Sequence, residues 1–155
     1  DVLVADHRGY ARLRCPVTHQ RTLRLDRTSG VLVIDDELSG TAYHAFTLSL
    51  TLDDRCRARL DDSAKAIDPS TIVETEVSDA TRSVTIEDAA TGQPLVSIRV
   101  ECDASSAFAV EERFVSRAYG QKHLSTGLTW SGHALFPLRF HTVITPIATA
   151  GEVAP

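Results

Sequence analysis

Apolar and polar residues alternate along almost the whole chain, and glycine, proline and short acidic turns interrupt the alternation at intervals typical of antiparallel sheets. A period of two residues indicates strands that bury one face, whereas no segment carries the apolar stripe of a helix about a dozen residues long. The pattern predicts strands over the following ranges: Val2–Ala5, Tyr10–Arg14, Val17–Leu25, Val31–Asp36, His44–Leu52, Ile72–Val77, Ser83–Glu87, Leu95–Glu101, Phe108–Ser116, Lys122–Trp130 and Ala134–Thr145.

Roughly eleven short strands cannot bury both faces in one flat sheet, so the economical architecture is two sheets packed face to face. We therefore predict an all-β fold, an antiparallel two-sheet β-sandwich of roughly eleven strands. It forms one domain over residues 1–147, and residues 148–155 are expected to be a flexible tail. The span Asp53–Ser70 has no clear pattern and is predicted to be a loop or a short helical turn.

Residues of one parity on a strand share a face, which predicts the side chains of the core. The odd residues of Val17–Leu25 and the even residues of His44–Leu52 form the apolar faces. Turn residues predict hairpins at Thr28–Gly30, Thr91–Gly92 and Ser131–Gly132. In the last hairpin, apolar side chains of the two strands are expected to face each other. These are Leu124, Leu128 and Trp130 on the first strand and Ala134, Phe136, Leu138 and Phe140 on the second.

Three ionisable residues, His19, Arg21 and His44, lie on the predicted apolar faces, where burying each alone would cost several kcal/mol. If the turn at Thr28 pairs Asp26 with Gly30, Arg21 lies opposite Asp35 on one face. The same register sets His19 opposite Glu37.

Three interpretations of this cluster stay open. It is a satisfied polar cluster at the rim of the sandwich, or it faces a groove or partner domain and touches substrate, or His19, His44 and Asp35 hold a metal. The other histidines, His123 and His133 and His141, lie on outward parities and are expected to be solvated.

Composition excludes several classes of protein. The chain has 155 residues, a net charge of -5 and 43% hydrophobic residues, typical of a globular domain. Its basic residues are scattered, so nucleic acid is not an expected partner. No apolar run approaches the 18 or so residues of a membrane span. The three cysteines are expected to be free thiols, with a Cys56–Cys102 disulfide as the alternative.

Five runs of residues, in order along nearly the whole chain, carry a resemblance to a known family: His7-Arg8-Gly9-Tyr10 through Leu13; Val17-Thr18-His19-Gln20-Arg21; Val31-Leu32-Val33-Ile34-Asp35-Asp36-Glu37-Leu38-Ser39-Gly40 with His44; Ser116-Arg117-Ala118-Tyr119-Gly120; and Phe136 through Pro146. The chain resembles the C-terminal β-sandwich domain of heparinase II/III-like polysaccharide lyases. The chain also begins at Asp1 without a signal peptide, so we expect an excised piece of a larger bacterial protein.

The resemblance implies β-elimination of uronic-acid polysaccharides, with an N-terminal α-helical toroid as the partner domain and a bacterial periplasmic or cell-envelope location. In that family the catalytic tyrosine and its asparagine or histidine partner lie largely on the toroid, and a His-x-His motif and zinc ligands lie upstream. The chain has neither asparagine nor His-x-His, so we assign it no catalytic residue, no metal ligand and no cofactor, and zinc is possible only upstream. His19, Arg21, Asp35 and His44 match family positions whose role is structural or interfacial.

Two classes of function remain open on the sequence. The chain is either the part of a lyase that completes the substrate cleft or the interdomain scaffold, inactive by itself, or a non-catalytic module that binds carbohydrate or protein. A sugar-binding module would present an aromatic platform. Trp130 has core parity, which favours the first class.

Overall fold

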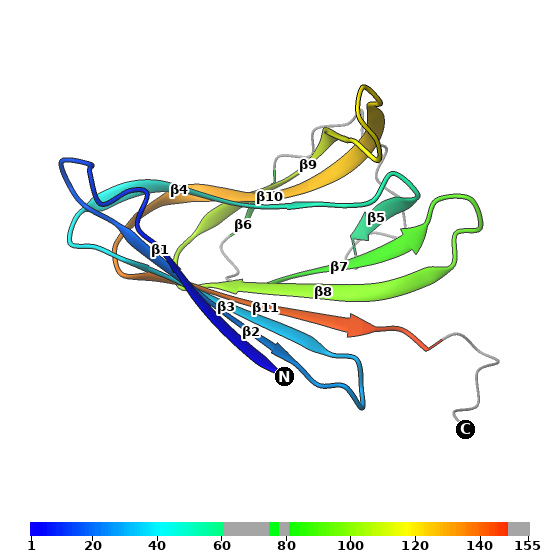
Figure 1. Ribbon diagram of the computed structural model, residues 1–155, viewed down its shortest axis with the longest axis horizontal. Coiled ribbons are helices and arrows are strands. Elements are labelled where there is room, and N and C mark those ends of the chain that lie inside the picture. The colour runs from blue at the N-terminus through cyan, green and yellow to red at the C-terminus, as the bar shows by residue number, and fades with distance from the viewer. Residues whose placement is uncertain (61–74, 78–80, 149–155) are drawn as a thin grey trace.

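The computed structural model describes residues 1–60, 75–77 and 81–148, and in these ranges the chain forms strands and no helix. Every strand pairing is antiparallel, which confirms the predicted all-β sandwich (Figure 1). The strands are β1 (Val2–His7), β2 (Thr18–Leu25), β3 (Leu32–Ser39), β4 (Tyr43–Thr51), β5 (Cys56–Leu60), β6 (Thr75–Val77), β7 (Thr81–Asp88), β8 (Pro94–Cys102), β9 (Ser106–Val115), β10 (His123–Leu135) and β11 (Leu138–Pro146).

The strands form two sheets of unequal width. The larger has seven strands in the order β1-β2-β3-β11-β8-β7-β5, and the smaller has four in the order β4-β10-β9-β6. Three predictions fall partly outside the described residues: 61–70 of the loop or helical turn, 72–74 of one strand and 149–155 of the tail.

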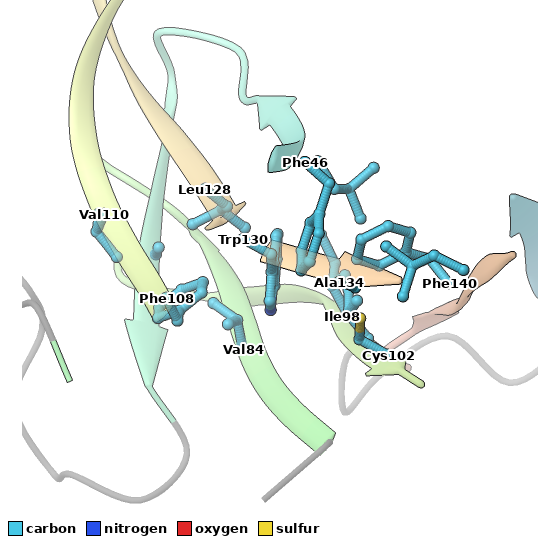
Figure 2. Close-up of a cluster of buried hydrophobic side chains, with 14 of the residues drawn as sticks. Phe46, Val84, Ile98, Cys102, Phe108, Val110, Leu128, Trp130, Ala134 and Phe140 are labelled. Atoms are coloured by element: carbon cyan, nitrogen blue, oxygen red, sulfur yellow. The ribbon is translucent and has the colours of Figure 1, made fainter. Parts of the chain in front are cut away.

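The core lies between β4, β10 and β9 on one side and β11, β8, β7 and β5 on the other. Figure 2 shows Trp130 at its centre, with Phe108 and Val84 beside it. The burial pattern confirms the predicted parity of β4, and the buried residues from Leu128 to Phe140 are confirmed as well. Leu124 is the exception, because it lies on an exposed part of β10. The predicted parity of β2 is supported by its register, which sets Arg21 and Leu23 opposite the buried Asp36 and Ile34.

The predicted turn at Ser131–Gly132 is wrong. Strand β10 continues through these residues to Leu135 and stays in register with β4. Glycine is required there by a close approach, because a Cβ on Gly132 would lie 2.9 Å from both the backbone oxygen of Ser105 and Cζ of Phe46. The chain instead crosses to the other sheet at Phe136–Pro137, a cis peptide whose proline has no N–H to donate to a ladder.

Two further strand assignments differ from the prediction. Tyr10–Arg14 forms a turn, in which the N–H of Leu13 donates to the Tyr10 carbonyl at 3.2 Å. Cys56–Leu60, predicted to be a loop or helical turn, forms β5 at the edge of the larger sheet. Its alternating sequence is too short and too charged to be recognised alone, and its pairing with β7 supplies the hydrogen bonds that make it a strand.

The turn between β2 and β3 is one residue longer than predicted. Asp26 pairs with Val31, to which its N–H donates at 2.9 Å, and the N–H of Gly30 closes the loop on the Asp26 carbonyl at 2.8 Å. Gly30 has a φ of 71°, in the left-handed region that favours glycine. The turn at Thr91–Gly92 is confirmed.

The longer turn shifts the β2–β3 register by one residue, and a shift of one residue places every side chain on the opposite face. The predicted pairing of Arg21 with Asp35, and of His19 with Glu37, is therefore wrong. Arg21 lies opposite Asp36.

Candidate functional site

A buried carboxylate forms the centre of a three-residue cluster on the inner face of the larger sheet, which we call the ionic trio: His19, Arg21 and Asp36. The Nε and Nη2 of Arg21 donate to Asp36 Oδ1 and Oδ2 at 2.7 and 2.9 Å. His19 Nε2 lies 2.6 Å from Asp36 Oδ1. Asp36 is only 3% exposed, whereas the side chains of His19 and Arg21 are 27% and 39% exposed.

The register explains why these three side chains meet. Odd residues of β2 and even residues of β3 share the inner face, so His19, Arg21 and Asp36 point to the same side. The hydrogen bonds to Asp36 raise the pKa of Arg21, although burial opposes the shift. Arg21 therefore stays charged, and the buried carboxylate is compensated as a buried charge must be.

Asp35 lies on the opposite, outer face of the same sheet and belongs to a separate cluster. His141 Nδ1 lies 2.6 Å from Asp35 Oδ1, and Arg24 Nη1 donates to Asp35 Oδ2. Burial opposes ionisation of Asp35, but the hydrogen bonds from His141 and Arg24 outweigh it and lower its pKa. Asp35 therefore does not join the trio, and His141, expected to be solvated, is half-exposed and paired.

The outer face around Asp35 is hollowed by a charged groove of about 410 Å³. Arg139 Nε lies 3.4 Å from Glu37 Oε2 in this groove, beside the Arg24–Asp35 pair. The basic and acidic groups thus compensate one another across β2, β3 and β11, which favours cross-strand pairing over recognition of a single-sign ligand.

His44 lies at the start of β4, on the other sheet, and lines an apolar pocket of about 240 Å³. Its ring packs 4.8 Å from that of Phe136, and its buried Nε2 has no hydrogen-bond partner. Tyr10 and Leu13, from the loop between β1 and β2, form the opposite wall. The four predicted site residues therefore occupy three places: the trio, the outer face and this pocket.

The part of the chain that the structure describes contains no group of three or more His, Cys, Asp or Glu side chains able to hold a metal ion. Cys15, Cys56 and Cys102 are free thiols, as predicted, and burial raises the pKa of both Cys56 and Cys102. Among the described residues, no helix is long and apolar enough to cross a membrane.

The sequence analysis missed Asp36, the residue that holds the trio together. The adjacent aspartates of β3 point to opposite faces, so the choice between them depends on the register alone. The available signal was Gly30, because glycine suits a left-handed position inside the loop, and counting it in the loop pairs Asp26 with Val31.

Comparison with protein families gives one match over nearly the whole chain: the family model "Heparinase II/III-like, C-terminal" matches residues 1–151. No curated protein matches the sequence.

Solved structures show the same fold. A heparinase III aligns with 94% of this chain at 19% identity and a TM-score of 0.55, and the chain covers 19% of that protein. A mutant of the heparan sulfate lyase HepC from Pedobacter heparinus aligns with 100% of this chain at 15% identity and a TM-score of 0.58, with 21% of that protein covered. The chain thus spans about a fifth of the length of these structures.

Proposed function

Because the chain belongs to the heparinase II/III-like family, whose C-terminal domain matches residues 1–151, we propose that it is the C-terminal β-sandwich part of a polysaccharide lyase. The match over nearly the whole chain is the observation that carries this proposal. The lyase cleaves a uronic-acid polysaccharide of the heparan sulfate type by β-elimination. A base removes the C5 proton, which neutralisation of the uronate carboxyl makes acidic, and another group protonates the leaving oxygen.

The described part of the chain contributes scaffold to this reaction. Three of its six histidines are paired with carboxylates: His19 with Asp36, His141 with Asp35, and His123 Nδ1 with Asp54 at 3.4 Å. These pairs support a structural role for the clusters. We assign the proton-transferring groups, and the zinc that family members hold, to the rest of the lyase.

The predicted site residues then act at a domain interface. His19 and Arg21 lie where the core gives way to an exposed inner face, and His44 lines an open pocket beside it. An α-helical toroid and further parts of the lyase are the proposed neighbours. Asp35, on the outer face, stabilises strand pairing.

Lyase activity of the 155-residue chain and of the intact protein tests this function. The absorbance of unsaturated uronate products is followed with heparan sulfate, hyaluronan and alginate as substrates. We expect the intact protein to produce a rise and the 155-residue chain to produce none, because the proton-transferring groups lie outside it. A sustained rise from the chain alone would contradict the assignment.

Binding without cleavage would favour the alternative. If the intact protein retains heparan sulfate on a column but generates no unsaturated product, the sandwich is a non-catalytic carbohydrate-binding module instead of part of a lyase.

A further inference from the structure

The seven-stranded sheet is wider than the sheet that covers it. Strand β4 is the edge of the smaller sheet and lies over β11, because the rings of Phe46 and Phe140 pack edge to face with centroids 5.5 Å apart. The smaller sheet ends there, whereas the larger continues through β3, β2 and β1 (Figure 1). The difference in width is three strands, the same three that extend beyond β4.

In the described part of the chain, the inner face of β1–β3 continues the apolar core and loses its cover from β3 outward: Ile34 and Asp36 of β3 are buried, whereas Leu25 of β2 and Leu3 of β1 are exposed. One cross-strand row runs from Leu3 through Leu23 and Ile34 towards the buried Thr142. A second runs from Leu25 through Leu32 and into Ile144 and Ile98, which belong to the core or pack against it.

Exposure rises along both rows away from the core. Ile98 is 4% exposed, whereas Leu25 is 39% and Leu3 is 60% exposed. An exposed apolar face that extends the core is typical of an interaction surface.

The edge of β4 beside this face has free backbone groups. The N–H of Leu52 donates to the Thr126 carbonyl at 2.9 Å in the register that continues β4 along β10. Residue pairs in an antiparallel ladder alternate between hydrogen-bonded and non-hydrogen-bonded pairs. Because Leu52 is hydrogen-bonded to β10, the N–H and C=O groups of Ala45, Thr47 and Ser49 point away from β10. In the described part of the chain no strand pairs with them.

A pocket lies at one end of the same edge. It is lined by His44, Ala45 and Thr47 of β4 and by Tyr10 and Leu13, and it offers an apolar place for a side chain of an added strand.

We propose that further β-strands of the same protein, from polypeptide outside these 155 residues, continue the smaller sheet from the free edge of β4 and cover the inner face of β1–β3. Strands satisfy both features together, since the first pairs with β4 while their side chains cover the leucines, whereas a helix would leave the β4 amides unpaired. The inference rests on the proposed function, which makes the chain part of a longer lyase. The aligned structures leave ample chain, because this one covers only 19% and 21% of them.

The chemistry of the face specifies the strands. Their inward side chains are apolar where they meet Leu23, Leu25 and Leu32, and an acid or amide suits the half-exposed Arg21.

Hydrogen–deuterium exchange in the intact protein tests the pairing. We expect the amides of Ala45, Thr47 and Ser49 to exchange at least about 100-fold more slowly than in an unstructured peptide. The amides of Phe46 and Leu48, which face β10, serve as internal controls because they are protected whether or not a further strand is present. Fast exchange at the three edge amides beside protected controls would overturn the proposal.

A matched pair of variants of the intact protein tests the cover. Leu25 and Leu95 are 39% and 38% exposed, but Leu95 lies on β8, at the register shift against β7 and away from β1–β3. Leu25→Ser is expected to lower Tm by several degrees more than Leu95→Ser. Equal, small effects would overturn the proposal, and so would a large effect of Leu25→Ser combined with fast edge exchange, which would indicate a helical cover.

The proposed function is judged separately by heparan sulfate cleavage. An active lyase with an unprotected β4 edge would retain the function and overturn the added strands. An inactive protein with a protected β4 edge would overturn the proposed function and retain the added strands.

Discussion

Asp36 needs charged or hydrogen-bonding partners on the inner face, because its carboxylate is almost completely buried. It accepts two hydrogen bonds from Arg21 and lies in bonding distance of His19. A buried carboxylate without such partners would be strongly unfavourable. The trio therefore holds β2 to β3 in one register, and its contribution is largest where burial excludes water.

Two double-mutant cycles compare the inner and outer pairs of β2 and β3. Removing Arg21 leaves a buried charge, so the Arg21–Asp36 cycle, measured by urea denaturation, is expected to give a coupling of about 1–3 kcal/mol. The Arg24–Asp35 cycle is expected to give under about 1 kcal/mol, because both side chains are at least a third exposed.

A third cycle serves as the control for the register. Arg21 and Asp35 lie on opposite faces, so their coupling is expected to be near zero. A large Arg21–Asp35 coupling with a small Arg21–Asp36 coupling would contradict the register described above.

At the scale of elements, β5 is a short edge strand held by a single neighbour. It lies at the edge of the larger sheet, where it pairs in regular register with β7. The buried Glu87 carboxylate accepts hydrogen bonds from Arg59 at 2.6 Å and Arg57 at 3.1 Å. These two arginines of β5 thus attach the edge strand to β7 through one buried carboxylate.

Stability should depend on the ionisation of Glu87. The hydrogen bond from Arg59, aided by Arg57 and opposed by burial, lowers the Glu87 pKa. A group whose pKa is depressed by folding stabilises the protein above its unfolded pKa, about 4.3 for Glu, and the contribution is lost as pH falls through the folded pKa.

Glu87→Gln is therefore expected to lower the free energy of unfolding by about 1–3 kcal/mol at pH 7. The difference should shrink towards zero below about pH 3. Urea titrations at several pH values measure it, and Glu112→Gln, at an exposed position, is the control. A difference that does not change with pH would contradict the role of the Glu87 charge.

For the whole molecule, the exposed apolar surface is concentrated at one side. Every residue of β1 is exposed, and the first four residues of the strand are apolar. A free edge strand without lysine or proline readily pairs with another chain. Within the described residues, β1 therefore presents both an unpaired edge and an exposed face.

The 155-residue chain is expected to self-associate, so its weight-average mass by light scattering should rise with protein concentration. Leu3→Lys places a charge on both the edge and the face, and it should lower the association. Leu135→Lys is the matched control, since Leu135 is 63% exposed and Leu3 is 60% exposed, but Leu135 lies on the other sheet. A chain that stays monomeric at every concentration would contradict the interface.

The sequence by itself determined the features that depend on local stereochemistry. Successive side chains of a strand point to opposite faces, so alternation alone predicted most of the strands, the buried parities of β2 and β4, and hence an all-β sandwich. The same alternation singled out His19 and Arg21 as ionisable residues on an apolar face. Both do lie on the inner face, against a carboxylate.

Tertiary structure decided what depends on the pairing of distant segments. The β2–β3 loop has one residue more than predicted, so Asp36 instead of Asp35 lies at the centre of the trio. Register depends on how two strands pair, and neither strand alone specifies it. In the sequence Gly132 indicates a turn, and only the tertiary structure shows that the ring of Phe46 leaves no room for a Cβ at this position. The open face of β1–β3 appears only when a seven-stranded and a four-stranded sheet are packed together, since no local pattern records how far the covering sheet extends.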